Sequence, residues 1–257
     1  MDAKFAYAKA IIKEAGAYIK SRMTEDLTVE EKSDYTDLVT NIDKDTQNFL
    51  VSKINQAYPD DAIFGEENNL YHDVKDGEVW VLDPIDGTVN FIAQGRDFAV
   101  MIAYYEDGQG KFGLIYDVME DRLYSGGGEF PVTCNERPLQ PYQQKPLKRQ
   151  LLGANGHMYA ENFHGLADFA DHLLGVRVLG SAGISMSRVL EGELIGYVSS
   201  ISPWDYAAAS IMGQRLGYIT KTVTGEALDY QSRQPVMFIP LAESQVIEQL
   251  LADKSTT

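Results

Sequence analysis

The stretch WVLDPIDGTVNF, residues 80–91, carries the strongest structural signal in this chain. It overlaps an apolar run, VWVL (79–82), that is short and flanked by turn formers, as expected of a buried strand. Pro84 fixes its own φ and pushes Asp83 toward extended geometry, so we expect the strand to end at Asp83 and the chain to turn at once. A turn at this point brings Asp83 and Asp86 to one locus.

Two neighbouring carboxylates at the end of a buried strand require a cation. Burying unpaired anions side by side is costly, because each loses its hydration and repels the other. If the turn leaves the Ile85 carbonyl unpaired, a third oxygen faces the same point. Hard cations such as Mg²⁺ take oxygen ligands of this kind, so the segment is suited to binding a hard cation.

Gly87 and Thr88 follow the second aspartate directly. Gly87 permits close backbone approach, and Thr88 can begin a helical turn whose first amides are unsatisfied and free to hold a phosphate oxygen. Taken alone, the D-G-T sequence is explained equally well by an ordinary turn with a helix N-cap.

Acidic residues recur at three other predicted element boundaries. They are GEE (65–67) after an apolar run, PWD (203–205) before an alanine-rich helix, and DLVTNID (37–43) at the start of a helix. A solvated acid or a helix N-cap explains any one of them. Together with DPID they make four such sites, which are harder to dismiss as solvated acids or caps than any one of them.

The composition excludes several classes of protein. A chain of 257 residues with 44% hydrophobic and 23% charged residues fits one large domain or two closely packed halves. Its formal net charge of −16 repels nucleic acid and anionic membranes, although bound metal ions can still attract an anionic substrate. A lone cysteine, Cys134, excludes an intrachain disulfide and a cysteine zinc site. We find no membrane-spanning run and no secretory signal, which predicts a cytoplasmic protein.

The N-terminal part of the chain combines helical and strand-like periodicity. Apolar residues recur at helical spacing over residues 1–22 and 38–59, predicting two helices joined by a polar, acid-rich loop at 24–37. Residues 98–128 alternate apolar runs with turns and predict an antiparallel meander. Its three glycines, 126–128, lack the context of a phosphate loop and predict a turn or bulge.

From Leu151 onward, predicted strands alternate with helices, and Gly217 is expected to be a helix C-cap. The helices are expected at 163–174, 184–192, 204–217 and 242–254. We divide the chain into two tightly packed halves, residues 1–140 with an antiparallel sheet and residues 141–257 with α/β structure. The boundary is expected around Pro138 to Pro146. The expected class is mixed α/β, arranged in layers.

The order and spread of these motifs resemble the inositol monophosphatase family of Mg²⁺-dependent phosphatases. The resemblance rests on DLVTNID, GEEN, WVLDPIDGTVNF, GSAG (180–183) and PWDYAA. It implies an α-β-α-β-α sandwich, usually a homodimer, that hydrolyses small phosphate monoesters with a metal-activated water. It also implies two or three Mg²⁺ per active site and inhibition by lithium.

The resemblance also implies roles for single residues. Glu66, Asp83 and the Ile85 carbonyl match the ligands of one metal, and Asp83, Asp86 and Asp205 match those of a second. Thr88, with Asp43 or Glu66, matches the group that positions the attacking water and receives its proton. Lys32 matches a family position on the loop near a third metal. The positions that match substrate-binding residues are Asp86, Gly87, Thr88, Ser181, Ala182, Val198 and Asp205.

One departure from the family pattern concerns the alcohol part of the substrate. Inositol-specific members carry a glutamate seven residues before the aspartate of the WD motif, and here that position is Val198. A valine accepts no hydrogen bond from a hydroxyl, so we expect modest activity on inositol 1-phosphate and higher activity on another phosphate ester. A fructose-1,6-bisphosphatase or an NADP or nucleotide phosphatase on the same scaffold, and a noncatalytic regulatory binding module, stay as alternatives.

Overall fold

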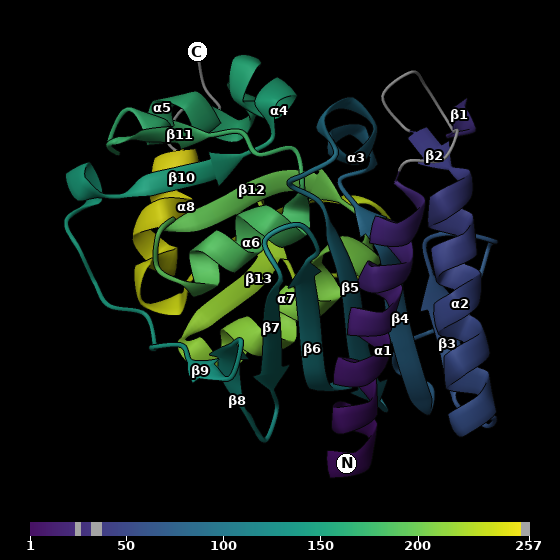
Figure 1. The fold of residues 1–257 in the computed structure, drawn as a ribbon. Helices are drawn as coiled ribbons and strands as arrows, with labels where there is room; N and C mark the ends of the chain where they lie inside the picture. Colours follow the sequence, from purple (N-terminus) through teal and green to yellow (C-terminus); the bar gives the residue numbers. More distant parts are fainter. Residues whose placement is uncertain (24–26, 32–37, 253–257) are drawn as a thin grey trace.

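The computed structural model describes residues 1–23, 27–31 and 38–252 (Figure 1). Its helices are α1 (Asp2–Arg22), α2 (Asn41–Ala57), α3 (Thr88–Gln94), α4 (Gly156–Ala160), α5 (Leu166–Ala170), α6 (Ala182–Leu190), α7 (Pro203–Leu216) and α8 (Ser244–Ala252), with short 3₁₀ turns at Leu147–Arg149, Phe163–Gly165 and Leu241–Glu243. No helix in these ranges is both long and apolar enough to span a bilayer.

Within the described ranges, seven strands form the first sheet in simple chain order. They are β3 (Ala62–Gly65), β4 (Glu78–Asp86), β5 (Ala99–Glu106), β6 (Gln109–Asp117), β7 (Arg122–Gly127), β8 (Phe130–Cys134) and β9 (Arg137–Pro138). Only the β3–β4 pair is parallel, and every later pair is antiparallel. The predicted meander over 98–128 is therefore confirmed.

A second sheet of five strands lies in the C-terminal part of the chain, in the order β11-β10-β12-β14-β13. Its strands are β10 (Leu151–Ala154), β11 (Gly175–Arg177), β12 (Gly196–Ile201), β13 (Tyr218–Thr222) and β14 (Gln234–Pro240). β10 pairs in parallel with β11 and β12, while β14 runs antiparallel to β12 and β13. The predicted division at residue 140 falls between the two sheets, after β9 and before β10.

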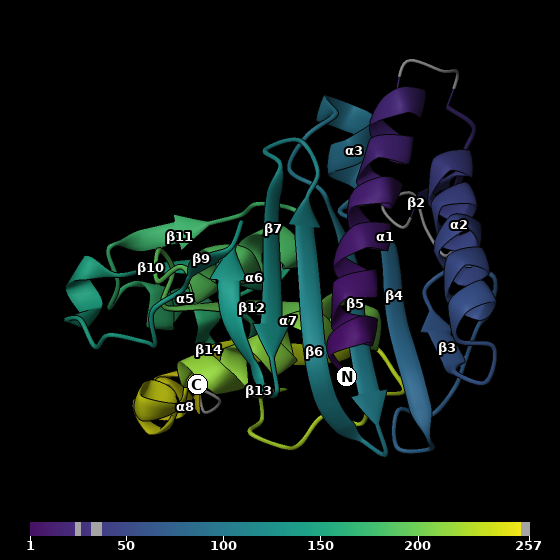
Figure 2. The same ribbon diagram turned by 60° about the horizontal axis from the view of Figure 1, so that its bottom comes forward.

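The two sheets and three helical layers alternate, as Figures 1 and 2 show from two directions. α1 and α2 cover one face of the first sheet, α6 and α7 lie between the sheets, and α4, α5 and α8 cover the outer face of the second sheet. Each interface contains its own apolar core. The expected α-β-α-β-α sandwich is confirmed.

Strand alternation explains how one strand serves two of these cores. In β4, Val79 and Val81 face the α6–α7 layer, while Trp80 and Leu82 face α1 and α2. Successive side chains of a strand point to opposite faces, so a continuous apolar run is required wherever both faces are covered. The VWVL run is therefore a strand with both faces buried.

Close packing fixes α7 against the first sheet. A Cβ atom added at Gly113 on β6 would lie 2.2 Å from the carbonyl oxygen of Ala208 on α7, far inside van der Waals contact. The missing side chain lets the helix backbone approach the sheet directly. As a result the N-terminus of α7, which carries Asp205, has a fixed position relative to the end of β4.

Four sequence expectations differ from the structure in detail. The expected loop at 24–37 contains strand β1 (Val29–Glu31), which pairs with β2 (Leu38–Thr40), and residues 24–26 and 32–37 lie outside the described ranges. β2 also displaces the start of the second helix, because Thr40 caps α2. The expected helix at 163–174 is two short pieces, because His164 has φ 48° and interrupts the helix.

The fourth difference concerns the end of β4. The strand does not end at Asp83 but continues to Asp86, with a shift of register between the two. Two smaller expectations are confirmed: Gly217 caps α7 with a left-handed φ of 87°, and the glycine run 126–128 contains a register shift in β7.

Candidate active site

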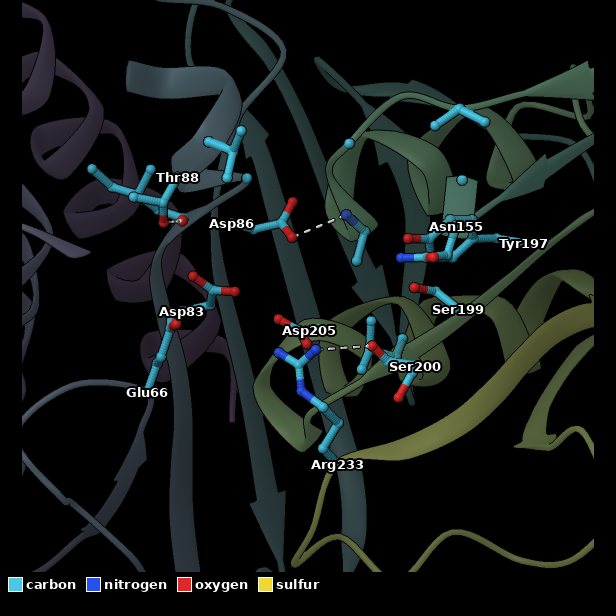
Figure 3. Close-up of a pocket in the computed structure, with 18 of the residues that line it drawn as sticks. Glu66, Asp83, Asp86, Thr88, Asn155, Tyr197, Ser199, Ser200, Asp205 and Arg233 are labelled. Atoms are coloured by element: carbon cyan, nitrogen blue, oxygen red, sulfur yellow. Dashed lines mark hydrogen bonds between the residues drawn. The ribbon is translucent and has the colours of Figure 1, made fainter. Parts of the chain in front are cut away.

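A pocket of about 320 Å³ lies where β4, β12 and the N-termini of α3, α6 and α7 meet (Figure 3). Its lining residues are Leu38, Glu66, Asp83, Ile85, Asp86, Gly87, Thr88, Val89, Ala154, Asn155, Gly156, Val178, Gly180, Ala182, Tyr197, Ser199, Ser200, Ile201, Asp205 and Arg233. The pocket therefore collects acids from three separate sequence motifs.

A β-bulge explains why both aspartates of DPID face this pocket. Asp83 pairs with Met101 and Asp86 pairs with Ala99, so three steps along β4 match two steps along β5. Residues three apart on a regular strand point to opposite faces, and one extra residue brings them to the same face. The Ile85 side chain remains in the core, only 1% exposed.

Asp83 is a buried carboxylate surrounded by other acidic residues. It is 1% exposed, and neither of its oxygens has a hydrogen-bond partner in the part of the chain that the structure describes. Burial, followed by repulsion from Glu66, Asp86 and Asp205, raises the pKa of Asp83 well above its usual value. A native protein rarely retains such a group unless something else binds it.

The acids around Asp83 form a donor set that fits Mg²⁺. Asp83, Asp86 and Asp205 each offer one carboxylate oxygen, and these oxygens lie within 4.8 Å of one another. Glu66 follows the parallel strand β3, where its amide N–H donates to the Leu82 carbonyl at 3.2 Å, and this contact sets it beside Asp83. A set made only of oxygens is typical of a hard divalent cation.

Asp86 is held at the N-terminus of α6. The Ala182 amide donates to its Oδ1 at 3.0 Å, the Gly183 amide donates to its Oδ2 at 2.8 Å, and the Ser181 hydroxyl donates to the same Oδ2. These donors oppose the effect of burial, which raises the pKa of Asp86. Ser181 and Ala182, expected from the sequence to bind substrate, orient Asp86 in this structure.

Asp43 and Asp205 each serve a helix cap and the site at once. Both occupy the third position of a capping box, in which Asp43 Oδ2 accepts the Thr40 amide at 2.9 Å and Asp205 Oδ2 accepts the Ser202 amide at 2.7 Å. Burial is the main cause that raises the pKa of Asp43 to about 6 and that of Asp205 to about 7. The N-cap explanation and the functional explanation of these acids are thus compatible.

Thr88 links Asp43 to the pocket. Its hydroxyl lies 3.1 Å from Asp43 Oδ1 and 3.1 Å from the Ile85 carbonyl, and it donates its single proton to one of these acceptors at a time. Gly87 precedes it with a left-handed φ of 89° and caps α3, as the sequence indicated. Asp43 itself is fully buried and reaches the pocket only through Thr88.

Asn90, near the start of α3, joins the segment after α3 to the segment before α6. Its side-chain amide donates to the Asp97 carbonyl at 2.8 Å and to the Leu179 carbonyl at 2.7 Å. A Cβ atom added at Gly180 would lie 2.7 Å from the Asn90 oxygen. The start of α3 and the GSAG loop are consequently fixed relative to each other.

The structure does not bring Val198 into the pocket. Val198 is 1% exposed and packs in the outer core of the second sheet, whereas its neighbours Tyr197 and Ser199 line the pocket. The alternation of β12 explains this placement, and the period of two could have identified both neighbours from the sequence. Lys32 lies outside the described residues.

Sequence reasoning missed five polar residues of the pocket. They line it without belonging to any acidic motif and are Asn155, Tyr197, Ser199, Ser200 and Arg233. Arg233 lies just before β14, about 150 residues away from the DPID segment along the chain, and only the pairing of β12 with β14 brings it here. Nothing in its local sequence signals that position.

Comparisons with known proteins agree with this fold and site. A family model described as the inositol monophosphatase family matches residues 2–254. The chain is 39% identical over 240 residues to the inositol-1-monophosphatase of Bacillus subtilis (strain 168), covering 90% of this chain and 89% of the relative. It is also similar to a crystal structure of SaIMPase-II with bound 2′AMP, with TM-score 0.85, 30% identity and coverage of 98% and 94%. An IMPase/NADP phosphatase complexed with Mg²⁺ and phosphate shares the fold, with TM-score 0.89, 24% identity and coverage of 96% and 94%.

Replacing Asp83 with asparagine should stabilise the metal-free protein. In EDTA at pH 8 we expect Asp83→Asn to raise the free energy of unfolding by on the order of 2 kcal/mol, because a buried unpaired charge becomes a neutral amide. Because the folded-state pKa is raised, this difference is absent below about pH 4, where the carboxyl is protonated in both states, and grows as the pH rises. Urea denaturation at both pH values measures it.

The same variant should lose its response to Mg²⁺. Mg²⁺ should raise the melting temperature of the wild type but scarcely change that of Asp83→Asn, while an exposed control, Asp60→Asn, should behave as the wild type. A destabilised Asp83→Asn protein in EDTA, or one that Mg²⁺ stabilises fully, would contradict the assignment.

The placement of Val198 can be tested with a matched pair of substitutions. Val198→Glu should lower the free energy of unfolding by on the order of 3 kcal/mol, because it buries a carboxylate in an apolar core. Val246→Glu makes the same change at a position on α8 that is 44% exposed, and it should alter stability by only about 0.5 kcal/mol. Equal stability of the two variants would place Val198 at the pocket instead.

Proposed function

The chain belongs to the inositol monophosphatase family and is a phosphoric monoester hydrolase, and on that premise we propose that it uses Mg²⁺ in the pocket around Asp83. The observation that carries the proposal is the buried Asp83 carboxylate, which lacks a partner in the described chain and lies among Glu66, Asp86 and Asp205. A Mg²⁺-dependent attack of water on a small phosphate monoester is the chemistry that this donor set supports best.

We assign the ligands as two overlapping sets. Glu66, Asp83 and the Ile85 carbonyl would hold one Mg²⁺, and Asp83, Asp86 and Asp205 would hold a second, with Asp83 shared. When bound, Mg²⁺ supplies positive charge that lowers the pKa of water and stabilises the leaving oxygen. The Mg²⁺ and phosphate present in the similar IMPase/NADP phosphatase support this choice of metal. We propose two or three Mg²⁺ ions per active site, as the family resemblance implies.

Thr88 and Asp43 form a route for the proton of the attacking water. When Thr88 donates its hydroxyl proton to Asp43 Oδ1, its oxygen retains lone pairs to accept a proton from water. Asp43 then receives the Thr88 proton as Thr88 takes the proton from water, so the base is buried and separated from the pocket by one hydroxyl. Glu66 is the alternative acceptor.

The start of α3 provides the phosphate-binding side of the pocket. Helix starts leave their first amides without intrahelical partners, and those of Gly87 and Thr88 are the nearest to Asp86 in the chain. The left-handed φ of Gly87 turns the chain sharply from β4 into α3. We propose that these two amides bind an oxygen of the scissile phosphate.

The alcohol part of the substrate contacts the wall formed by β12. Because the Val198 side chain lies in the core, Tyr197, Ser199 and Ser200 present an uncharged polar surface instead of a glutamate. We propose modest activity on inositol 1-phosphate and higher activity on a sugar phosphate or a nucleotide 2′-phosphate. The 2′AMP bound to SaIMPase-II favours the nucleotide alternative.

We further propose a cytoplasmic homodimer that lithium inhibits, as in the family to which the chain belongs. The net charge of −16 argues against nucleic acid or anionic membranes as partners, so the substrate is a small molecule. The intact acidic cluster favours a catalytic protein over a regulatory binding module.

A phosphate-release assay tests the proposed function. With Mg²⁺ present, the purified chain should release inorganic phosphate from a panel of small phosphate monoesters, and EDTA should abolish the release. Absence of turnover over the whole panel, with Mg²⁺ binding demonstrated by calorimetry, would reject the enzymatic role.

Asp43→Asn separates chemistry from metal binding. We expect kcat to fall by roughly 10²–10⁴-fold, because the base is lost, while the Mg²⁺ concentration for half-maximal activity changes little. Asp60→Asn, an exposed aspartate outside the pocket, serves as the control with unchanged kcat. A wild-type kcat in Asp43→Asn would exclude the Thr88–Asp43 route.

A further inference from the structure

Charge is distributed unevenly over the walls of the pocket. All the carboxylates that line it, from Glu66 to Asp205, lie on the side of β4 and the start of α7, whereas Asn155, Tyr197 and Ser199 on the facing wall are uncharged (Figure 3). Within the described residues, Arg233 is the only cationic side chain in the lining. The facing wall is therefore neutral to positive in charge.

Arg233 has most of its hydrogen-bonding capacity available. Its Nη1 donates to the Ser200 carbonyl at 3.2 Å, which anchors the guanidinium at the edge of β12. It lies next to Asp205 in Figure 3, and its positive charge lowers the pKa of Asp205 against the larger, opposite effect of burial. A guanidinium has five N–H donors, and this hydrogen bond uses one of them.

The metal ions do not make Arg233 redundant. Two divalent cations would offset the charge of the four carboxylates Glu66, Asp83, Asp86 and Asp205, so that Arg233 would then add a net positive charge to the pocket. An anchored guanidinium beside a substrate pocket is well suited to bind an anion, because its planar fork fits carboxylate and phosphate.

The position of Arg233 separates it from the scissile phosphate. In Figure 3, Thr88 and Arg233 lie on opposite sides of the acidic residues Asp83 and Asp205. A phosphate at the Gly87 and Thr88 amides would therefore leave Arg233 for another part of the bound molecule. The pocket, about 320 Å³, is large enough for a sugar-sized group beside the phosphate.

From these observations we propose that Arg233 determines specificity, by binding a second anionic group on the alcohol part of the phosphate ester. This inference rests on the proposed phosphatase function and names the substrate class of the same site. The recognised chemistry is a phosphate or carboxylate carried by the alcohol, as in a bisphosphorylated sugar, a nucleotide with two phosphates or a phosphorylated hydroxy acid. A simple surface arginine that ties β12 to the following loop would have no such selectivity.

Matched pairs of substrates isolate the effect of the second anionic group on activity. Adenosine 2′,5′-bisphosphate and 2′-AMP differ only by one phosphate, fructose 1,6-bisphosphate and fructose 1-phosphate differ likewise, and 3-phosphoglycerate differs from glycerol 3-phosphate by a carboxylate. The measured quantity is the ratio of kcat/KM within each pair, for the wild type and for Arg233→Gln. We expect Arg233→Gln to reduce at least one of these ratios by roughly tenfold or more, through KM.

Two further variants test whether the effect depends on the shape and on the location of the arginine. Arg233→Lys keeps the charge but loses the planar fork, so it should restore part of the ratio that Arg233→Gln loses. Arg137→Gln removes an exposed arginine on β9, outside the pocket, and should leave the ratios as in the wild type. The pair that responds identifies whether phosphate or carboxylate is the preferred second anion.

Three outcomes would overturn the inference while leaving the phosphatase function intact. Unchanged ratios would make Arg233 a purely structural residue. An equal loss of kcat/KM on both members of every pair would place Arg233 at the scissile phosphate. Ratios below one in the wild type for all three pairs would show that the pocket rejects a second anion. By contrast, no turnover of any substrate by the wild type would contradict the proposed function itself.

Discussion

The rest of the structure depends on the burial of the Asp83 carboxylate without a hydrogen-bond partner in the described chain. An isolated anion at that depth costs several kcal/mol unless a cation joins it. The elements around Asp83 place further oxygen ligands beside it. β3 runs parallel to β4 and positions Glu66, and a bulge in β4 turns Asp86 to the same face. The N-terminus of α7 positions Asp205. The burial of Asp83 therefore has an electrostatic cost that a bound cation would relieve.

Hydrogen bonds at helix N-termini fix the positions of these carboxylates. Asp43 and Asp205 each commit Oδ2 to the first turn of a helix, so the position of each carboxylate is fixed by the helix start itself. Asp86 is held in a similar way by the first amides of α6. Because these bonds belong to secondary structure, the site is rigid before any ligand arrives, which is the condition for preorganised catalysis.

The sequence predicted the parts of the molecule that local chemistry determines. The helical stripes, the meander and the acidic motifs are all visible in residue spacing, and the resemblance of DPIDGT to a known family supplied the layers. The extension of β4 through Pro84 could not be read from the sequence, because proline favours a strand end and only the pairing with β5 shows the bulge. Val198 and Arg233 depend on strand alternation and on the pairing of β12 with β14, which are tertiary features.

The most direct test of the central claim is anomalous diffraction from crystals soaked with Mn²⁺, which occupies Mg²⁺ sites and scatters strongly. The account predicts two peaks within coordination distance of the Asp83 carboxylate, one shared with Glu66 and the Ile85 carbonyl and one shared with Asp86 and Asp205. A map without a peak at Asp83, or with Mn²⁺ held only by acids elsewhere on the surface, would contradict it.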